Sequence, residues 1–108
     1  MTLDLPKPIA AYFAADKADS EAVSQCFTKN AVVKDEGQTY HGRRAIKKWK
    51  ADASAKYQYT NVPLAYEEQD GTVIITARLT GNFPGSPVNL RFSFGLEGDE
   101  IASLKITP

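Results

Sequence analysis

The apolar residues of this chain change their spacing near Tyr57, and this change limits the folds that the chain can adopt. Upstream of it they recur three and four residues apart, as on the buried face of a helix, and Ile9, Tyr12 and Phe13 give the first example. Downstream they alternate with polar residues, most regularly over residues 88–96, which predicts a half-buried strand. Helices followed by strands and tight turns predict an α+β domain in which the helices cover one face of an antiparallel sheet.

The pattern predicts three helices and six strands. The first helix begins near Pro8, the second is capped by Asp19 and extends to Phe27, and the third spans residues 42–54. The Asp70-Gly71 pair between two β-rich segments indicates a hairpin. The expected strands are residues 31–34, 39–40, 57–67, 72–83, 88–96 and 101–107.

The length, charge and cysteine content of the chain limit the number of domains and the classes of partner that are expected. A chain of 108 residues builds one core, so residues 1–108 are expected to form a single domain. Thirteen basic and thirteen acidic residues give no net charge, which argues against a nucleic-acid partner. Cys26 is the only cysteine, so an internal disulfide and a zinc site of paired cysteines are both excluded. No signal peptide or long apolar segment is apparent, and the expectation is a cytoplasmic protein without a membrane partner.

The order of elements from Asp19 to Trp49 is helix, short strand, turn, short strand and helix, with Asp35 at its centre. With the segments 19–23, 30–35 and 40–46, it resembles the SnoaL-like and nuclear transport factor 2-like superfamily, which includes ketosteroid isomerase and small polyketide cyclases. The resemblance implies a cone-shaped α+β barrel, with three N-terminal helices packed in a strongly curved, mixed but mainly antiparallel sheet. It also implies an internal cavity, a homodimer formed through the outer sheet face, and no cofactor.

Asp35 is the first candidate for chemistry. The resemblance aligns it with the catalytic base of ketosteroid isomerase, and an Asp that faces an apolar cavity can move a proton next to a carbonyl group. The alternative is a turn residue, because Asp35-Glu36-Gly37 is also common turn chemistry. Tyr12 lies near the position of the isomerase's donor tyrosine, but one residue away, and such a shift turns a helical side chain by about 100°.

Other candidates are less closely tied to the family's mechanism. Residues 88–96 contain no acid where the family's late-strand carboxylate is expected, and Arg91 lies near that place, so steroid isomerase activity is not expected. In the cavity Arg91 could hold a carboxylate or enolate; on the outer face it is a solvated or interface residue. His41 precedes the third helix, where it either contacts substrate or orders the start of that helix.

Aromatic residues supply the expected apolar wall. Trp49, Phe27, Phe13 and Tyr57 are the predicted substrate contacts, although aromatic side chains also fill the core of a curved sheet. No histidine, cysteine and carboxylate cluster at metal-ligand spacing accompanies them. The basic residues of the third helix are predicted to form a solvated face: Arg43, Arg44, Lys47, Lys48 and Lys50.

Two hypotheses for the function follow. In the first, the protein is an isomerase, cyclase or dehydratase that moves a proton on a hydrophobic carbonyl compound, with Asp35 as base and Tyr12 or another tyrosine as donor. In the second, the missing late-strand carboxylate indicates a non-catalytic ligand-binding or dimerising module. The expected ligand in the first case is a small hydrophobic molecule.

Overall fold

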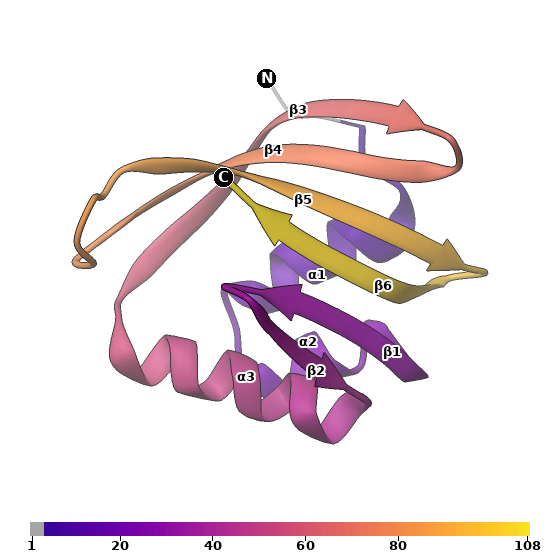
Figure 1. The fold of residues 1–108 in the computed structure, drawn as a ribbon, viewed down its shortest axis with the longest axis horizontal. Helices are drawn as coiled ribbons and strands as arrows, with labels where there is room; N and C mark the ends of the chain where they lie inside the picture. The colour runs from indigo at the N-terminus through magenta and orange to yellow at the C-terminus, as the bar shows by residue number, and fades with distance from the viewer. Residues whose placement is uncertain (1–3) are drawn as a thin grey trace.

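Three helices and one six-stranded sheet make up the computed structural model, which describes residues 4–108 (Figure 1). The helices are α1 (Lys7–Asp16), α2 (Ser20–Ser24) and α3 (Arg43–Lys56). The strands are β1 (Phe27–Asp35), β2 (Gln38–His41), β3 (Tyr59–Gln69), β4 (Thr72–Gly81), β5 (Val88–Glu97) and β6 (Glu100–Thr107). Within residues 4–108 no helix is long and apolar enough to cross a membrane.

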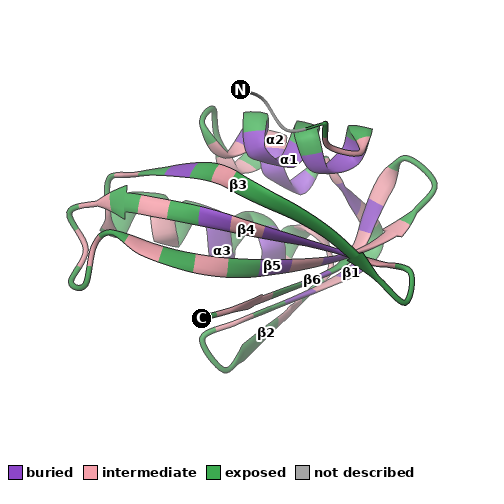
Figure 2. Ribbon diagram, turned by 90° about the horizontal axis from the view of Figure 1, so that it is seen from above, coloured by how far each residue is buried: buried purple, intermediate pink, exposed green. Residues whose placement is uncertain are grey.

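The sheet is strongly curved and its strands follow the order β2-β1-β6-β5-β4-β3. Every neighbouring pair is antiparallel except β1 and β6, which run parallel, with Val33 opposite Leu104. All three helices lie on the same side of the sheet, and β3 rises from the end of α3 to the far edge (Figures 1 and 2). The predicted cone-shaped α+β fold is therefore confirmed.

The second helix begins as predicted but ends earlier. Asp19 caps it, since its Oδ1 accepts a hydrogen bond from the backbone N–H of Ala22 at 2.7 Å. The prediction that this helix extends to Phe27 was wrong, because the helix ends at Ser24 and Phe27 is the first residue of β1, opposite Ile101. Phe27 is fully buried. A short apolar segment is buried equally well as helix or strand, so burial alone could not distinguish the two.

Five aromatic side chains join α1 to the sheet and form the centre of the core. Tyr12 packs edge-on against Phe13 and Phe94, with ring centroids 5.3 and 5.5 Å apart. Its ring lies 6.0 Å from that of Phe27, also edge to face. We call Tyr12, Phe13, Phe27, Phe92 and Phe94 the aromatic cluster. Burial of these rings supplies much of the force that holds α1 on the sheet.

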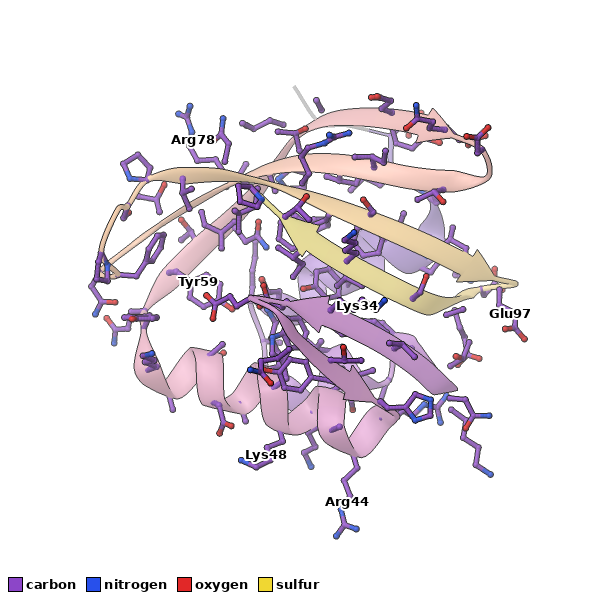
Figure 3. All side chains as sticks on the ribbon, in the orientation of Figure 1. Lys34, Arg44, Lys48, Tyr59, Arg78 and Glu97 are labelled. Atoms are coloured by element: carbon purple, nitrogen blue, oxygen red, sulfur yellow. The ribbon has the colours of Figure 1, made fainter. Side chains whose placement is uncertain are left out.

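The predicted solvated face of α3 is correct for some of its basic residues and wrong for one. Arg44 and Lys48 point away from the sheet into solvent (Figure 3). Lys50 is buried, because it lies four residues after Ile46 and next to Trp49, on the stripe that faces the interior. The sequence prediction considered the charge of Lys50 and overlooked its position on the helix.

Candidate functional site

A cavity of about 590 Å³ opens between the C-terminal half of α3, the start of β3 and the turn that joins β4 to β5. These segments lie on the same side of the molecule (Figure 1). Apolar side chains form much of its wall: Trp49, Leu79, Phe83, Val88, Leu90 and Phe92. Polar side chains also line it: Asp35, Glu36, Tyr40, Lys50, Asp52, Lys56, Tyr57, Tyr59 and Asn61. A mainly apolar cavity with a few convergent polar groups is typical of a small-molecule site.

Asp35 is the last residue of β1, and its side chain reaches the cavity. One carboxylate oxygen accepts a hydrogen bond from Trp49 Nε1 at 3.1 Å. Burial raises the pKa of Asp35, the Trp49 hydrogen bond lowers it in part, and the net pKa lies above the ordinary value. Such a carboxyl group, when ionised, is a stronger base than an exposed Asp and can accept and return a proton.

Lys50 lies deeper in the wall and forms a buried ion pair with Asp16, the last residue of α1. Its Nζ lies 2.7 Å from Asp16 Oδ1, and the two side chains are 7% and 3% exposed. Burial alone would lower the pKa of Lys50, but its interactions with Tyr12, Asp16 and Tyr59 more than offset this effect, and that pKa lies above its ordinary value. The ammonium group also lies 4.7 Å from the centre of the Trp49 ring. Lys50 is therefore a fixed positive charge at the cavity.

Tyr59 and Asn61, two residues apart on β3, complete the hydrogen bonds around this pair. The Tyr59 hydroxyl accepts from Lys50 Nζ at 3.0 Å and lies 3.4 Å from Asp16 Oδ1. Asn61 Nδ2 donates to Asp16 Oδ2 at 3.2 Å. Figure 3 shows Tyr59 at the start of β3, on the side of the molecule where β1 ends. We call Asp16, Lys50, Tyr59 and Asn61 the Asp16 network.

The structure separates the predicted aromatic contacts into two groups. Trp49 and Tyr57 line the cavity, where Tyr57 packs edge-on against Phe83 with ring centroids 6.0 Å apart. Phe13 and Phe27 belong to the aromatic cluster and do not line the cavity. The difference follows from position, since both phenylalanines lie in the packed layer between α1 and the sheet.

Tyr12 also lies in the aromatic cluster and does not line the cavity. Its hydroxyl has no hydrogen-bond partner among residues 4–108, and burial raises its pKa well above the ordinary range. Its ring lies beside the Lys50 ammonium, 5.6 Å from centroid to Nζ. Tyr59, unlike Tyr12, is among the tyrosines that line the cavity.

Arg91 and His41 lie away from the cavity. Arg91 is exposed on the outer face of the sheet, opposite Thr76 on β4 and Thr107 on β6. His41 is exposed at the end of β2, beside a shallow hollow on the outer surface of α3. Neither side chain is among those that line the cavity.

Sequence reasoning overlooked three members of the Asp16 network. Asp16 lies four residues after Tyr12, and Lys50 four residues after Ile46, so each occupies an apolar stripe of its helix. Two opposite charges on buried stripes were therefore a usable signal of a buried pair. Asn61 had no such signal, because it meets Asp16 only through the fold, 45 residues away along the chain.

No group of three or more potential metal-ligating side chains occurs within the described residues 4–108.

The chain belongs to the SnoaL-like domain family, whose model matches residues 9–102. A proposed polyketide cyclase from Sinorhizobium meliloti is 38% identical, with a TM-score of 0.91 and coverage of 96% of each chain. No curated protein matches the sequence.

More distant solved structures share the fold. A hypothetical protein from Catenulispora acidiphila, with a ketosteroid isomerase-like fold and in complex with trimethylamine, is 23% identical. Its TM-score is 0.85, and the match covers 97% of this chain and 87% of that one. SalBIII, an epoxide hydrolase/cyclase-like enzyme of salinomycin pyran ring formation, is 20% identical with a TM-score of 0.78, over 93% of this chain and 86% of that one.

Proposed function

We propose that the protein is a cofactor-independent acid–base catalyst of the isomerase, cyclase or dehydratase type, acting on a small hydrophobic carbonyl compound. The observation that supports this most directly is the carboxyl group of Asp35, which lines the cavity, is held by Trp49 Nε1 at 3.1 Å and has a raised pKa. A raised pKa makes the ionised carboxylate a stronger base, which favours removal of a proton from carbon. The similarity to a proposed polyketide cyclase is consistent with this class of reaction.

The proposed step begins with the ionised carboxylate of Asp35. It removes a proton from the carbon next to the substrate carbonyl, and the electrons of that C–H bond move to the carbonyl oxygen as an enolate. Asp35 then returns the proton to another carbon in an isomerisation. In a cyclisation, the enolate carbon instead adds to a second carbonyl carbon of the same substrate, whose C=O π electrons move to its oxygen, and that oxygen takes the proton from Asp35. In a dehydration, the enolate expels a β-hydroxyl group, which leaves as water with that proton. No electron leaves the substrate, so the reaction needs no redox partner.

The enolate oxygen needs a donor, and the Asp16 network supplies one. The Tyr59 hydroxyl accepts a hydrogen bond from the Lys50 ammonium at 3.0 Å, which makes its own proton a stronger donor. In the proposed step this proton turns from Asp16 Oδ1, which accepts it at the long distance of 3.4 Å, to the enolate oxygen. Lys50 adds a fixed positive charge in a partly enclosed site, where the charge stabilises an oxyanion more strongly than it would in water. In this proposal Tyr59 takes the role that the sequence suggested for Tyr12.

The test is hydrogen–deuterium exchange at the α-carbon of 1-tetralone in D2O, followed by NMR. The wild-type protein should accelerate exchange, and Asp35→Asn should reduce the rate about 10²- to 10⁴-fold, the usual contribution of a general base. Asn keeps an acceptor for Trp49, so circular dichroism should show an unchanged fold.

The matched control is Asp99→Asn, which removes an exposed carboxylate in the turn between β5 and β6. This turn follows Glu97, on the opposite side of the molecule from Tyr59 (Figure 3). Exchange at the wild-type rate by both variants would remove Asp35 from the mechanism. Binding of ketones without any exchange would favour the ligand-binding alternative.

A further inference from the structure

The indole ring of Trp49 lies between the proposed base and the buried ion pair. Its Nε1 donates to Asp35 Oδ2 at 3.1 Å, and the Lys50 ammonium lies 4.7 Å from the centre of the ring. Asp16 in turn holds Lys50, with 2.7 Å between Oδ1 and Nζ. These four side chains form one continuous series of contacts from α1, through α3, to the end of β1.

The helix alone would not place the Lys50 ammonium over this ring. Successive residues of a helix point about 100° apart, so the side chains of Trp49 and Lys50 start in different directions. Asp16 on α1 and the Tyr59 hydroxyl on β3 hold the ammonium at 2.7 and 3.0 Å. Contacts from outside α3 therefore fix the cation beside the ring of the neighbouring residue.

The ring is held in place from other sides as well. Trp49 is 7% exposed, and Tyr40 of β2 packs on it with ring centroids 5.9 Å apart and planes 34° apart. Tyr40 is opposite Val33 on β1, two residues before Asp35. The donor nitrogen therefore keeps its direction toward the carboxylate.

The cation and the hydrogen bond act on the carboxylate in the same sense. A cation over the face of an indole draws on its π electrons and makes the ring N–H a stronger donor. A stronger donor stabilises the ionised form of the carboxylate that it binds. The charge of Lys50 also favours ionised Asp35 directly, against burial, which favours the neutral acid.

Other ionisable groups also lie around Asp35. Burial raises its pKa most, and the charge of Glu36 in the following turn raises that pKa further. The residue opposite Asp35 on β2 is the uncharged Gln38, and β6 contributes Ile106 to the cavity lining. Of the two lysines that line the cavity, Lys50 is the buried one. The remaining ionisable side chains of the lining are Tyr40, Asp52, Lys56, Tyr57 and Tyr59.

We propose that Lys50 is a positioning residue for the general base: it acts through the Trp49 indole to keep Asp35 ionised and directed into the cavity. This role differs from oxyanion stabilisation, because it is exerted on the base before any substrate binds. The inference rests on the proposed function and adds to it the residue that controls the base. In this account, Asp16 serves to hold the cation over the ring.

The pH profile of deuterium exchange into 1-tetralone separates the two roles of Lys50. Loss of oxyanion stabilisation lowers the rate at every pH, whereas weaker control of the base moves the rising limb to higher pH. The variant Asp16→Leu with Lys50→Met removes both charges and leaves neither unpaired. Its limb should lie at higher pH than the wild-type limb. On the wild-type limb its rate should fall by about a further three- to tenfold beyond the loss at high pH.

Tyr59→Phe is the matched comparison. It removes the proposed oxyanion donor and keeps Lys50 and Trp49, so it should lower the rate at every pH and leave the limb in place. Arg44→Met removes a cation that points from α3 into solvent and should change neither (Figure 3). A double variant with the wild-type limb would overturn the proposal. A limb that moves equally far in Tyr59→Phe would also overturn it, because the cation would not be the cause.

A second measurement needs no turnover. Trp49 is the only tryptophan, so one indole N–H signal in NMR spectra reports on the contact with Asp35. This signal should move as Asp35 titrates, Asp35→Asn should abolish the movement, and the double variant should show its midpoint at higher pH. An unchanged midpoint would overturn the proposal even if exchange is observed. A raised midpoint without exchange would support the control of Asp35 by Lys50 and reject the proposed function.

The route through the indole is tested by adding Trp49→Phe. The ¹³C signal of the Asp35 carboxyl carbon gives its titration midpoint in variants without an indole. Removal of the ion pair should move this midpoint less in the Trp49→Phe background than in the wild type, because the donor that Lys50 polarises is already missing. Equal movements in both backgrounds would show that Lys50 acts on the carboxylate directly, and would reject the route through Trp49.

Discussion

The aromatic cluster and the Asp16 network are both buried, and α1 contributes to both, but they differ in what their burial achieves. In the cluster, Tyr12, Phe27 and Phe94 remove apolar surface from water. In the network, Asp16 and Lys50 are 3% and 7% exposed, and two charges are taken out of water. Burial of apolar side chains stabilises a fold, whereas a buried ion pair often contributes little or nothing compared with apolar residues of similar volume. The cluster stabilises the fold, whereas the network has a role at the cavity in the proposed function.

The largest expected effect comes from breaking the ion pair on one side. Asp16→Leu leaves the Lys50 ammonium buried without its partner and should lower the free energy of unfolding by about 3–5 kcal/mol, measured by urea denaturation. The double variant Asp16→Leu with Lys50→Met removes both charges and should recover most of that loss. The rate of deuterium exchange into the ketone should nevertheless remain below the wild-type rate in the double variant, because the Lys50 ammonium is missing.

The aromatic cluster provides the contrast. Phe94→Ala should also cost about 3–5 kcal/mol, through the lost contacts and the cavity left behind. If the double variant is as unstable as Asp16→Leu alone, the network contributes to stability as the cluster does, and the distinction between them fails.

The next effect concerns the pH dependence of catalysis. In the wild-type protein the hydrogen bond from Trp49 lowers the pKa of the Asp35 carboxyl group. The Trp49→Phe variant keeps an aromatic ring but removes this hydrogen bond. The pKa of Asp35 should therefore rise further in the variant. The reaction uses ionised Asp35, so the exchange rate increases as pH rises through this pKa, and the rising limb of the profile should move to higher pH.

At a pH on that limb, we expect the Trp49→Phe rate to fall roughly tenfold, as for loss of one hydrogen bond to a charged group. At higher pH the two rates should converge. Parallel profiles with an unchanged limb would show that Trp49 does not control the ionisation of Asp35.

The smallest expected effect is the contribution of Asp35 to the free energy of unfolding. The folded pKa of Asp35 lies above its ordinary value of 3.8, so the folded state favours the protonated carboxyl group. The stability contributed by Asp35 is fully present below about pH 4 and is lost as pH rises through the folded pKa. Asn cannot ionise, so Asp35→Asn should be slightly more stable than the wild type at pH 7, and the difference should vanish at low pH. Urea denaturation at both pH values measures it; a variant less stable at pH 7 would contradict the prediction.

The sequence predicted the parts of this molecule that depend on local pattern. The alternation over residues 88–96 gave β5, the Asp70-Gly71 pair gave the hairpin of β3 and β4, and the resemblance brought attention to Asp35. The prediction for Lys50 was wrong because it relied on residue type. Its charge suggested that it lies in solvent, but its position on α3 places it in the interior. Asn61 could not be predicted to meet Asp16, because only the packing of α1 against β3 brings them together.

The parallel pairing of β1 with β6 has a consequence for how the protein is made. Val33 pairs with Leu104, so the strand that ends at Asp35 gains this neighbour only after β6 has been synthesised. Contacts between such distant segments form late and slow the folding of a domain. While β6 is still inside the ribosome, the emerging chain can form its helices and the hairpin of β1 and β2, but one edge of β1 is left without its partner. The wall that holds Asp35 is therefore completed only after the other strands of this sheet have been synthesised.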